Sequence, residues 1–230
     1  MCTISCLEFV AANLMQEDIR GKAVIEVGAY DVNGSCRSIV QLHSPARYVG
    51  VDIEKGPGVD EVCDACDLVA RFGPEKYDLL ISTEVIEHIR DWRKAISNFK
   101  NVLKPNGILV VTTRSKGFWY HGWPCDYWRY EVADLRVIFS DFIIKNVEKD
   151  TYLPGVFIKA RKPLQFLEND LSGYALYSII RKKRISHVKN INILLARIKY
   201  PFHRVLPRII PSFVKNFIKN RVRRRFLDST

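Results

Sequence analysis

The feature that most constrains this chain is a short apolar run followed at once by a loop that contains two glycines. Residues 23–27 are mostly strand-forming, Gly28 and Gly34 lie in the loop, and a helix can begin at Arg37. In an open parallel α/β sheet, ligands bind outside the carboxyl ends of the strands, where the backbone N–H groups of such a loop approach them. The pattern predicts a strand, a turn and a helix, with the turn either holding a nucleoside-bearing cofactor or acting as an ordinary connection.

This loop matches neither of two well-known phosphate-binding patterns. Tyr30 occupies the position of the second glycine in the dinucleotide pattern G-x-G-x-x-G, and no Gly-Lys-Ser/Thr follows to make a P-loop. The loop alone is therefore weak evidence for a ligand.

The chain up to residue 162 alternates between expected strands and expected helices. We expect strands at 23–27, 48–51, 59–63, 77–82, 108–113, 142–147 and 156–160, and helices at 7–19, 85–103 and 132–139. Such alternation is typical of an α/β fold, here a Rossmann-like, seven-stranded, mostly parallel sheet with helices on both faces. Residues 1–162 are predicted to form this domain.

Composition places the chain among ordinary globular proteins. Hydrophobic residues make up 47% and charged residues 27% of the sequence. No apolar run approaches the roughly 18 residues that a membrane-spanning helix needs, and the amino terminus lacks the pattern of a secretory signal. We expect a cytoplasmic protein with reduced thiols. Cys63 and Cys66 form a C-x-x-C without a second pair, so we expect no metal site there.

Charge is distributed unevenly along the chain. From Lys159 onward, 18 Lys and Arg residues face three acids, whereas the preceding residues are mildly acidic overall. Residues 163–230 are expected to form a basic, amphipathic, helical extension, most clearly at residues 212–227. A basic extension favours an anionic partner, either a membrane surface or, with less support, nucleic acid. The alternative is that its apolar side packs on the domain and its charges lie in water.

Acidic residues lie near the carboxyl ends of the expected strands. They are Glu26, Asp52, Asp64 and Glu84. An acid about 20 residues after a glycine loop can accept hydrogen bonds from both ribose hydroxyls. Because these acids occur in this order along the chain, a cofactor-binding loop is favoured over an ordinary strand-to-helix turn.

This ordered set resembles the successive motifs of class I S-adenosylmethionine-dependent methyltransferases. The subgroup it is most similar to is the methyltransferase type 11-like one, with a Glu-Val-x-Glu-His-like segment after the fourth strand. The resemblance covers about residues 21–162. The matching segments are Glu26-x-Gly28, Asp52, Asp64-Ala65, residues 77–88 (YDLLISTEVIEH) and residues 103–109 (LKPNGIL).

The resemblance implies S-adenosyl-L-methionine as the cofactor. In that family the glycine loop approaches the methionine part, the acid after the second strand binds ribose, and the acid after the third binds the adenine amino group. The expected cofactor contacts here are Glu26, Gly28, Ala29, Tyr30, Gly34, Asp52, Ile53, Asp64, Ala65, Thr83 and Glu84.

Three residues near the same edge are candidates for catalysis. Transfer from a sulfonium is mainly a matter of alignment, but a hydroxyl acceptor must also lose its proton to a base. His121, His88 and Asp126 are the candidates for this role, and His88 has the alternative of being an ordinary helix residue. The spacing of Glu84, Glu87 and His88 is not a zinc-binding pattern, so no metal is expected.

Residues 118–130 are unusually aromatic. Seven of these thirteen residues are Phe, Trp or Tyr, and they follow the fifth strand. Their rings could stack on a sugar or another flat acceptor, or hold a cation; alternatively, several of them, Tyr127 and Trp128 above all, form the core of a lid.

Taken together, these features predict a methyltransferase that methylates oxygen in a small-molecule, saccharide or lipid-linked glycan acceptor. Ser82-Thr83-Glu84-Val85 stands where enzymes that methylate base amino groups carry an Asn/Asp-Pro-Pro-Tyr-like segment. Two alternatives remain: an RNA or DNA methyltransferase whose basic tail binds phosphate, and a non-catalytic membrane-associated scaffold.

Overall fold

A seven-stranded mixed sheet forms the centre of the molecule. The computed structural model describes residues 3–122 and 125–199. The sheet has the order β3-β2-β1-β4-β5-β8-β7, in which β8 alone runs antiparallel to both of its neighbours. The strands are β1 (Ala23–Val27), β2 (Arg47–Asp52), β3 (Glu61–Val62), β4 (Tyr77–Thr83), β5 (Leu103–Arg114), β7 (Ile143–Lys149) and β8 (Gly155–Arg161). The expected Rossmann-like fold is confirmed.

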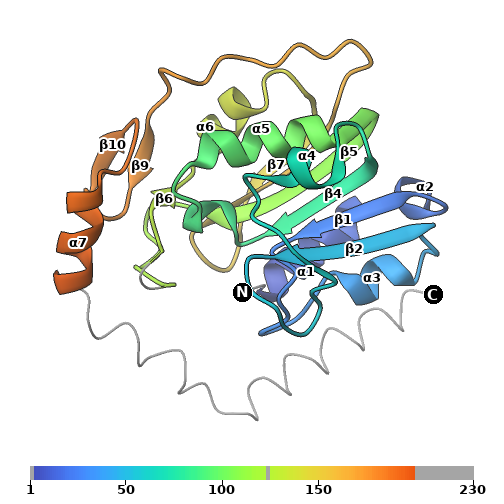
Figure 1. Ribbon diagram of the computed structural model, residues 1–230, viewed down its shortest axis with the longest axis horizontal. Coiled ribbons are helices and arrows are strands. Elements are labelled where there is room, and N and C mark those ends of the chain that lie inside the picture. The colour runs from blue at the N-terminus through green and yellow to red at the C-terminus, as the bar shows by residue number, and fades with distance from the viewer. Residues whose placement is uncertain (1–2, 123–124, 200–230) are drawn as a thin grey trace.

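Helices cover both faces of this sheet (Figure 1). Successive residues of a strand point to opposite faces, so Leu79 packs in one apolar cluster and Leu80 in the other. One face is covered by α1 (Ile4–Asn13), α2 (Gln16–Ile19) and α3 (Arg37–Gln41), and the other by α4 (Leu68–Phe72), α5 (Trp92–Val102) and α6 (Val132–Ile138). Buried on both faces, the central strands are almost entirely apolar.

The expected helix at 85–103 is wrong in its first third. The chain instead forms a short 3₁₀ turn, η1 (Ile86–His88), and starts α5 only at Trp92. Asp91 begins this helix, because its side chain accepts a hydrogen bond from the backbone N–H of Lys94 at 3.3 Å. The expected helix at 7–19 is likewise divided into α1 and α2, since the backbone is extended at Leu14.

The described part of the extension begins with strands. A second sheet of order β10-β9-β6 joins β9 (Leu176–Ser178) and β10 (Lys183–Ile185) to β6 (Trp128–Arg129), and α7 (Asn190–Lys199) follows. Arg93 of α5 donates hydrogen bonds to the carbonyls of Leu171 and Ser186, both at 2.7 Å.

Buried apolar side chains explain why this segment is not simply helical. Leu171, Leu176 and Val188 belong to the main apolar cluster, so residues 163–188 pack against the domain. The predicted helix at 212–227 lies outside the described residues. Among the residues that the structure describes, no helix is both long and apolar enough to cross a bilayer.

Candidate active site

The loop after β1 approaches the start of the β4–η1 connection at Gly28. Gly28 has a φ of +84°, and a Cβ added there would overlap the side chain of Val85. The N–H groups of Gly28 and Ala29 donate to the carbonyl of Val51 at 2.9 and 3.0 Å. Only glycine satisfies both the backbone conformation and this close approach. The glycine that the sequence singled out therefore lets the loop after β1 pack closely against Val85 at the carboxyl ends of β1 and β4.

Tyr30 lies over the turn between β2 and β3. A Cβ on Gly56 would overlap the Tyr30 ring, and the N–H of Asp31 donates to the carbonyl of Pro57 at 2.8 Å. The ring of Tyr30 is 37% exposed. Tyr30, which stands where the dinucleotide pattern has a glycine, thus connects the loop after β1 to the turn between β2 and β3.

The two acids that the sequence assigns to the nucleoside lie at the carboxyl ends of β2 and β3. Asp52 is half-buried and accepts hydrogen bonds from the N–H of Tyr30 at 3.3 Å and of Glu54 at 3.2 Å. Asp64 is exposed and accepts from the N–H of Cys66 at 2.8 Å. Each carboxylate retains lone pairs for ribose hydroxyls or an adenine amino group.

The remaining expected contacts of this edge differ in exposure. Ile53 is 66% exposed, whereas Ala29, Ala65 and Thr83 are buried. The N–H of Gly34 donates to Asp31 at 2.8 Å, which closes the loop after β1. Two carboxylates at the carboxyl ends of neighbouring strands, beside a glycine loop, fit a nucleoside-bearing cofactor.

Glu26 is held entirely by protein partners. It is 2% exposed and accepts hydrogen bonds from the N–H of Cys36 at 3.3 Å, from Ser35 at 3.4 Å and from the hydroxyl of Tyr48. Burial raises the pKa of its carboxyl group. Its observed role is to fix the loop after β1, and a direct contact with the cofactor stays a prediction.

Glu84 is also engaged within the protein. It is 3% exposed, has a φ of +58° and forms an ion pair with Arg114, which also contacts Asp150 at 3.3 Å. Burial is the largest influence on its carboxyl group and raises the pKa. A non-glycine residue in the left-handed region is uncommon and costs energy. This strained, ion-paired residue directs the chain from β4 into η1.

The described part of the aromatic lid, residues 115–122 and 125–131, is organised around a buried ion pair. Arg129 donates to Asp126 at 2.5 and 2.8 Å and to the carbonyl of Trp119 at 2.7 Å, and both charged side chains are fully buried. Burial raises the pKa of Asp126, but Arg129 and His121 outweigh it and lower that pKa to about 2. Asp126 is thus held in its ionised form by Arg129 and His121, and its expected role as a base stays a prediction.

Most lid aromatics are buried. Phe118, Tyr120, Tyr127, Trp128 and Tyr130 are at most 6% exposed. Tyr127 and Trp128 have a structural role, but they pack in the main apolar cluster of the domain and not in a separate core of the lid. Trp119 differs, since it is 57% exposed while its ring stacks on Phe118 with centroids 4.1 Å apart.

Hydrogen bonds fasten the lid to the η1 turn. The N–H of Tyr127 donates to the carbonyl of Glu87 at 3.0 Å, and the hydroxyl of Tyr130 donates to the carbonyl of Ile86 at 3.2 Å. Gly122, with a φ of +64°, lies so close to His88 that a Cβ would be 2.5 Å from its ring. These contacts bring His121 of the lid beside the turn.

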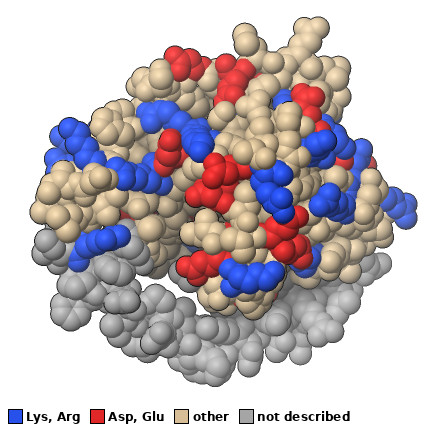
Figure 2. Space-filling model, in the orientation of Figure 1, with Lys and Arg blue, Asp and Glu red and all other residues tan. Residues whose placement is uncertain are grey.

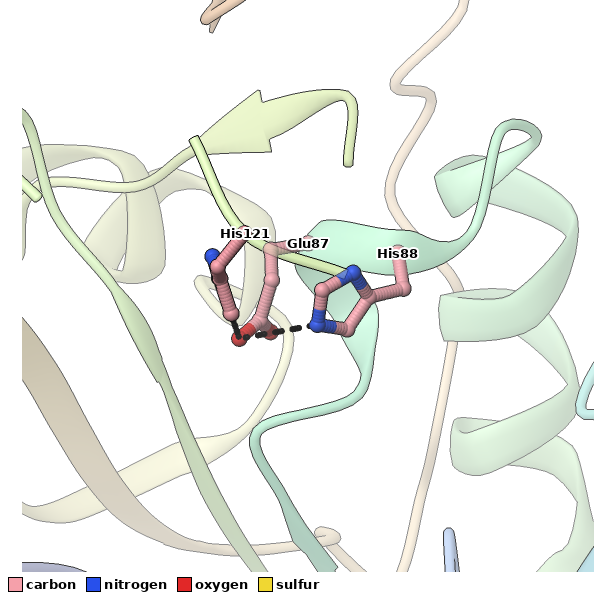
Figure 3. A group of neighbouring side chains, drawn as sticks. All are labelled: Glu87, His88 and His121. Carbon is pink, nitrogen blue, oxygen red and sulfur yellow. Dashed lines mark ion pairs between the residues drawn. The ribbon is translucent and has the colours of Figure 1, made fainter. Parts of the chain in front are cut away.

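Two histidines meet on either side of one glutamate (Figure 3). The Nε2 atoms of His88 and His121 each lie 3.8 Å from Oε1 of Glu87. Their Nδ1 atoms face away, that of His88 to the carbonyl of Cys125 at 2.6 Å and that of His121 to Asp126 at 3.1 Å. We call Glu87, His88 and His121 the His–Glu cluster.

Glu87 is the member of the cluster that the sequence analysis considered only as a metal ligand and set aside. It is fully buried, its Oε2 accepts a hydrogen bond from Thr113 at 2.9 Å, and its Oε1 is buried without a hydrogen-bond partner. Burial lowers the pKa of His88 and favours its neutral form. The sequence feature that could have revealed the cluster is the adjacent Glu87-His88 pair after a buried strand. Nothing in the sequence spacing, however, indicates that His121 lies beside this pair.

A family model described as a methyltransferase domain matches residues 5–144. The chain belongs to the S-adenosylmethionine-dependent methyltransferases. Ubiquinone biosynthesis O-methyltransferases are among its relatives: that of Bartonella tribocorum is 26% identical over 65% of this chain and 51% of the relative, and that of Burkholderia pseudomallei is 20% identical over 76% and 78%. This methyltransferase therefore spans about half the length of the first relative and more of the second.

Solved structures of other methyltransferases share its fold. The Burkholderia thailandensis 1,6-didemethyltoxoflavin-N1-methyltransferase, solved with that compound and S-adenosylhomocysteine, is 16% identical with a TM-score of 0.57 over 69% of this chain and 78% of the other. The Synechocystis magnesium protoporphyrin IX methyltransferase, solved with bound S-adenosylmethionine, is 17% identical with a TM-score of 0.53 over 69% and 79%.

Proposed function

We propose that this methyltransferase transfers a methyl group to a hydroxyl oxygen of a small-molecule acceptor. The observation that carries the proposal is the His–Glu cluster, two of whose members, Glu87 and His88, lie on the turn that follows Val85, the residue packed against Gly28. Alcohol and phenol oxygens are better nucleophiles once their proton is removed. The O-methyltransferase names of its relatives support the same acceptor atom.

The cofactor is assigned to the edge formed by the carboxyl ends of β1, β2 and β3. S-adenosylmethionine supplies an activated methyl group on a sulfonium. Gly28 and Ala29 are proposed to approach its methionine part, Asp52 its ribose and Asp64 its adenine. Their task is alignment, because a pre-activated donor mainly requires positioning.

The acceptor hydroxyl is assigned to the His–Glu cluster. His88 and His121 present their Nε2 atoms, and Asp126 holds His121 in place through Nδ1. Trp119 is the exposed aromatic ring of the described lid, and we propose that it stacks on a ring of the acceptor. A saccharide or lipid-linked glycan is the finer proposal for the acceptor class.

The cofactor assignment is tested by calorimetry with S-adenosylmethionine. Asp52→Ala is expected to weaken binding by about 10-fold or more, because one charge-assisted hydrogen bond is worth roughly 1.5–3 kcal/mol. Asp67→Ala is the matched control, since Asp67 is an exposed acid that pairs with Lys94 at 2.9 Å. Equal losses in both variants, or no binding by the folded parent protein, would contradict the assignment.

The acceptor atom is tested with methyl-labelled cofactor and a panel of phenols, saccharides and matched amines. Label is expected in ether linkages of the hydroxyl compounds. Transfer to the amines alone would refute oxygen methylation while leaving the cofactor site intact.

We further propose that the end of the described extension contacts an anionic membrane surface. Ile191, Leu194 and Leu195 are each more than half exposed on one side of α7. The exposed side chains of Arg181, Lys182 and Lys183 belong to the hairpin that precedes α7, and Figure 2 shows basic side chains along this edge of the molecule. Apolar residues beside cations favour an interface with acidic lipids.

Vesicle sedimentation tests this membrane proposal. Binding is expected to vesicles that contain phosphatidylserine, to fall with added salt, and to weaken in the Leu194→Glu variant. Equal binding to uncharged phosphatidylcholine vesicles, or salt-sensitive binding to RNA instead of vesicles, would overturn it.

A further inference from the structure

The His–Glu cluster has the composition of a metal centre. Imidazole nitrogens and a carboxylate oxygen are the common ligands of zinc and other divalent transition metals. One ligand atom from each of Glu87, His88 and His121 lies within 4.8 Å of the others. We propose that this cluster binds a divalent transition-metal cation of the zinc type beside the acceptor.

The three ligand atoms are nearly at coordination spacing. Each Nε2 lies 3.8 Å from Oε1 of Glu87, whereas ligands of a tetrahedral ion with bonds of ~2.0–2.1 Å are roughly 3.3 Å apart. The two imidazole rings, with centroids 4.6 Å apart, are tilted by 66°. Closing the cluster on a cation requires each His–Glu separation to shorten by about 0.5 Å and the remaining separation, within 4.8 Å, by up to ~1.5 Å, through rotation of the side chains.

The surroundings of the cluster are those of a prepared site. Histidine ligands usually donate their other ring N–H to a carbonyl or carboxylate, which fixes the orientation of the ring. Here Nδ1 of His88 meets the carbonyl of Cys125, Nδ1 of His121 meets Asp126, and Oε2 of Glu87 is held by Thr113. The two Nε2 atoms and Oε1 of Glu87 are thereby left facing one another.

An independent observation is the state of Oε1 in Glu87. This oxygen is fully buried, has no hydrogen-bond partner and points between the two imidazoles, as Figure 3 shows. A buried carboxylate oxygen without a partner costs several kcal/mol in general. A cation bound to Oε1 supplies the missing partner and the compensating charge.

Three protein ligands leave a fourth position open, which is typical of catalytic rather than structural zinc. An acceptor oxygen bound there has a lowered pKa, just as zinc lowers the pKa of bound water from about 15.7 to about 7. The O–H bond breaks, its proton goes to water, and the oxygen takes the methyl group as the sulfonium becomes a neutral thioether. This role rests on the proposed function, but cation binding itself does not.

Cobalt(II) is the probe for the site, because it replaces zinc and absorbs visible light when coordinated. Protein freed of metal by a chelator is expected to bind one equivalent of Co²⁺ with new visible absorption bands. Glu87→Gln, which keeps the shape of the side chain, and His121→Ala are each expected to lose these bands. Asp126→Asn is expected to weaken Co²⁺ binding by about 10–100-fold through the orientation of His121.

His187→Ala is the matched control, since His187 is an exposed histidine that contacts Ser186 at 3.1 Å and is not a member of the cluster. Its Co²⁺ binding and spectrum are expected to be those of the parent protein. Parent-like bands in Glu87→Gln or His121→Ala, or their loss in His187→Ala, would overturn the site. Calorimetry with S-adenosylmethionine on the same metal-free protein shows that it is folded, so absent Co²⁺ bands there refute the metal site and leave the cofactor assignment standing.

Discussion

The two ends of the central strands β1 and β4 differ in how their acidic residues are held. At the amino ends of β1 and β4, Asp78 accepts hydrogen bonds from the N–H of Ala23 and from Lys104, both at 2.9 Å. At the carboxyl ends, Glu84 has a left-handed backbone and Oε1 of Glu87 has no partner. Asp78 at the amino end is paired, whereas the strained backbone of Glu84 and the unpaired Oε1 of Glu87 lie at the end where the chemistry is proposed. The amino end has both features as well, since Glu75 has a φ of +54° and the buried hydroxyl of Tyr77 has no hydrogen-bond partner.

Gly28→Ala offers the largest expected effect at the carboxyl end. The new Cβ overlaps Val85 and the backbone has a φ of +84°, so we expect cofactor affinity to fall more than 100-fold and stability by about 2–4 kcal/mol. Calorimetry and urea unfolding measure the two changes.

Gly21→Ala is the control for this variant. Gly21 has a φ of +67°, but a Cβ there meets nothing within 4 Å. It is expected to cost only about 1 kcal/mol and to leave cofactor affinity unchanged. If both variants lost affinity equally, backbone strain in general, not the close approach at Gly28, would be responsible.

Asp78→Asn offers a smaller effect at the amino end. Burial raises the pKa of Asp78, but its hydrogen bonds from Ala23 and Lys104 outweigh this and lower the pKa below its ordinary value of 3.8. Because Asp78 is half-buried, we expect a loss of only about 1 kcal/mol at pH 7, with no change in cofactor affinity.

The pH dependence of this loss follows from the lowered pKa. Stability from the Asp78 carboxylate is fully present above pH 3.8 and disappears as the pH falls through the folded-state value. Parent and variant are therefore expected to converge in urea unfolding once the pH falls well below 3.8. A difference in unfolding free energy that stays constant down to that pH would contradict the assigned role of the Asp78 carboxylate. Weakened cofactor binding in the variant would contradict the separation of roles between the two ends of the strands.

Much of the fold followed from local sequence signals. The alternation of apolar strands and amphipathic helices is a short-range pattern, and it placed β1, β2, β4 and β5 correctly. Helix η1 was missed because Glu84 enters the left-handed region, a choice made by its ion pair with Arg114 and not by local propensity. The short strands β9 and β10 depend on pairing with β6, a contact distant in sequence.

The candidate site was predictable on its cofactor side and less so on its acceptor side. Gly28, Asp52 and Asp64 follow strands directly, so sheet order alone brings them to one edge. His121 reaches Glu87 only because Arg129 folds the lid and Tyr127 fastens it to η1, and these tertiary contacts have no sequence period. The sequence identified both histidines as candidates, but it did not predict that they lie beside the same glutamate.

The contact of Tyr30 with Gly56 also couples two loops that sequence treats as separate. The ring of Tyr30 covers Gly56, and the N–H of Asp31 is bound to the carbonyl of Pro57, so the loops after β1 and β2 form a single ledge. The loop proposed to contact the methionine part of the cofactor is therefore joined to the loop beside Asp52, which is proposed to contact the ribose. Variation in either loop is expected to require a matching change in the other, and redesign of this edge should exchange the two loops as a pair.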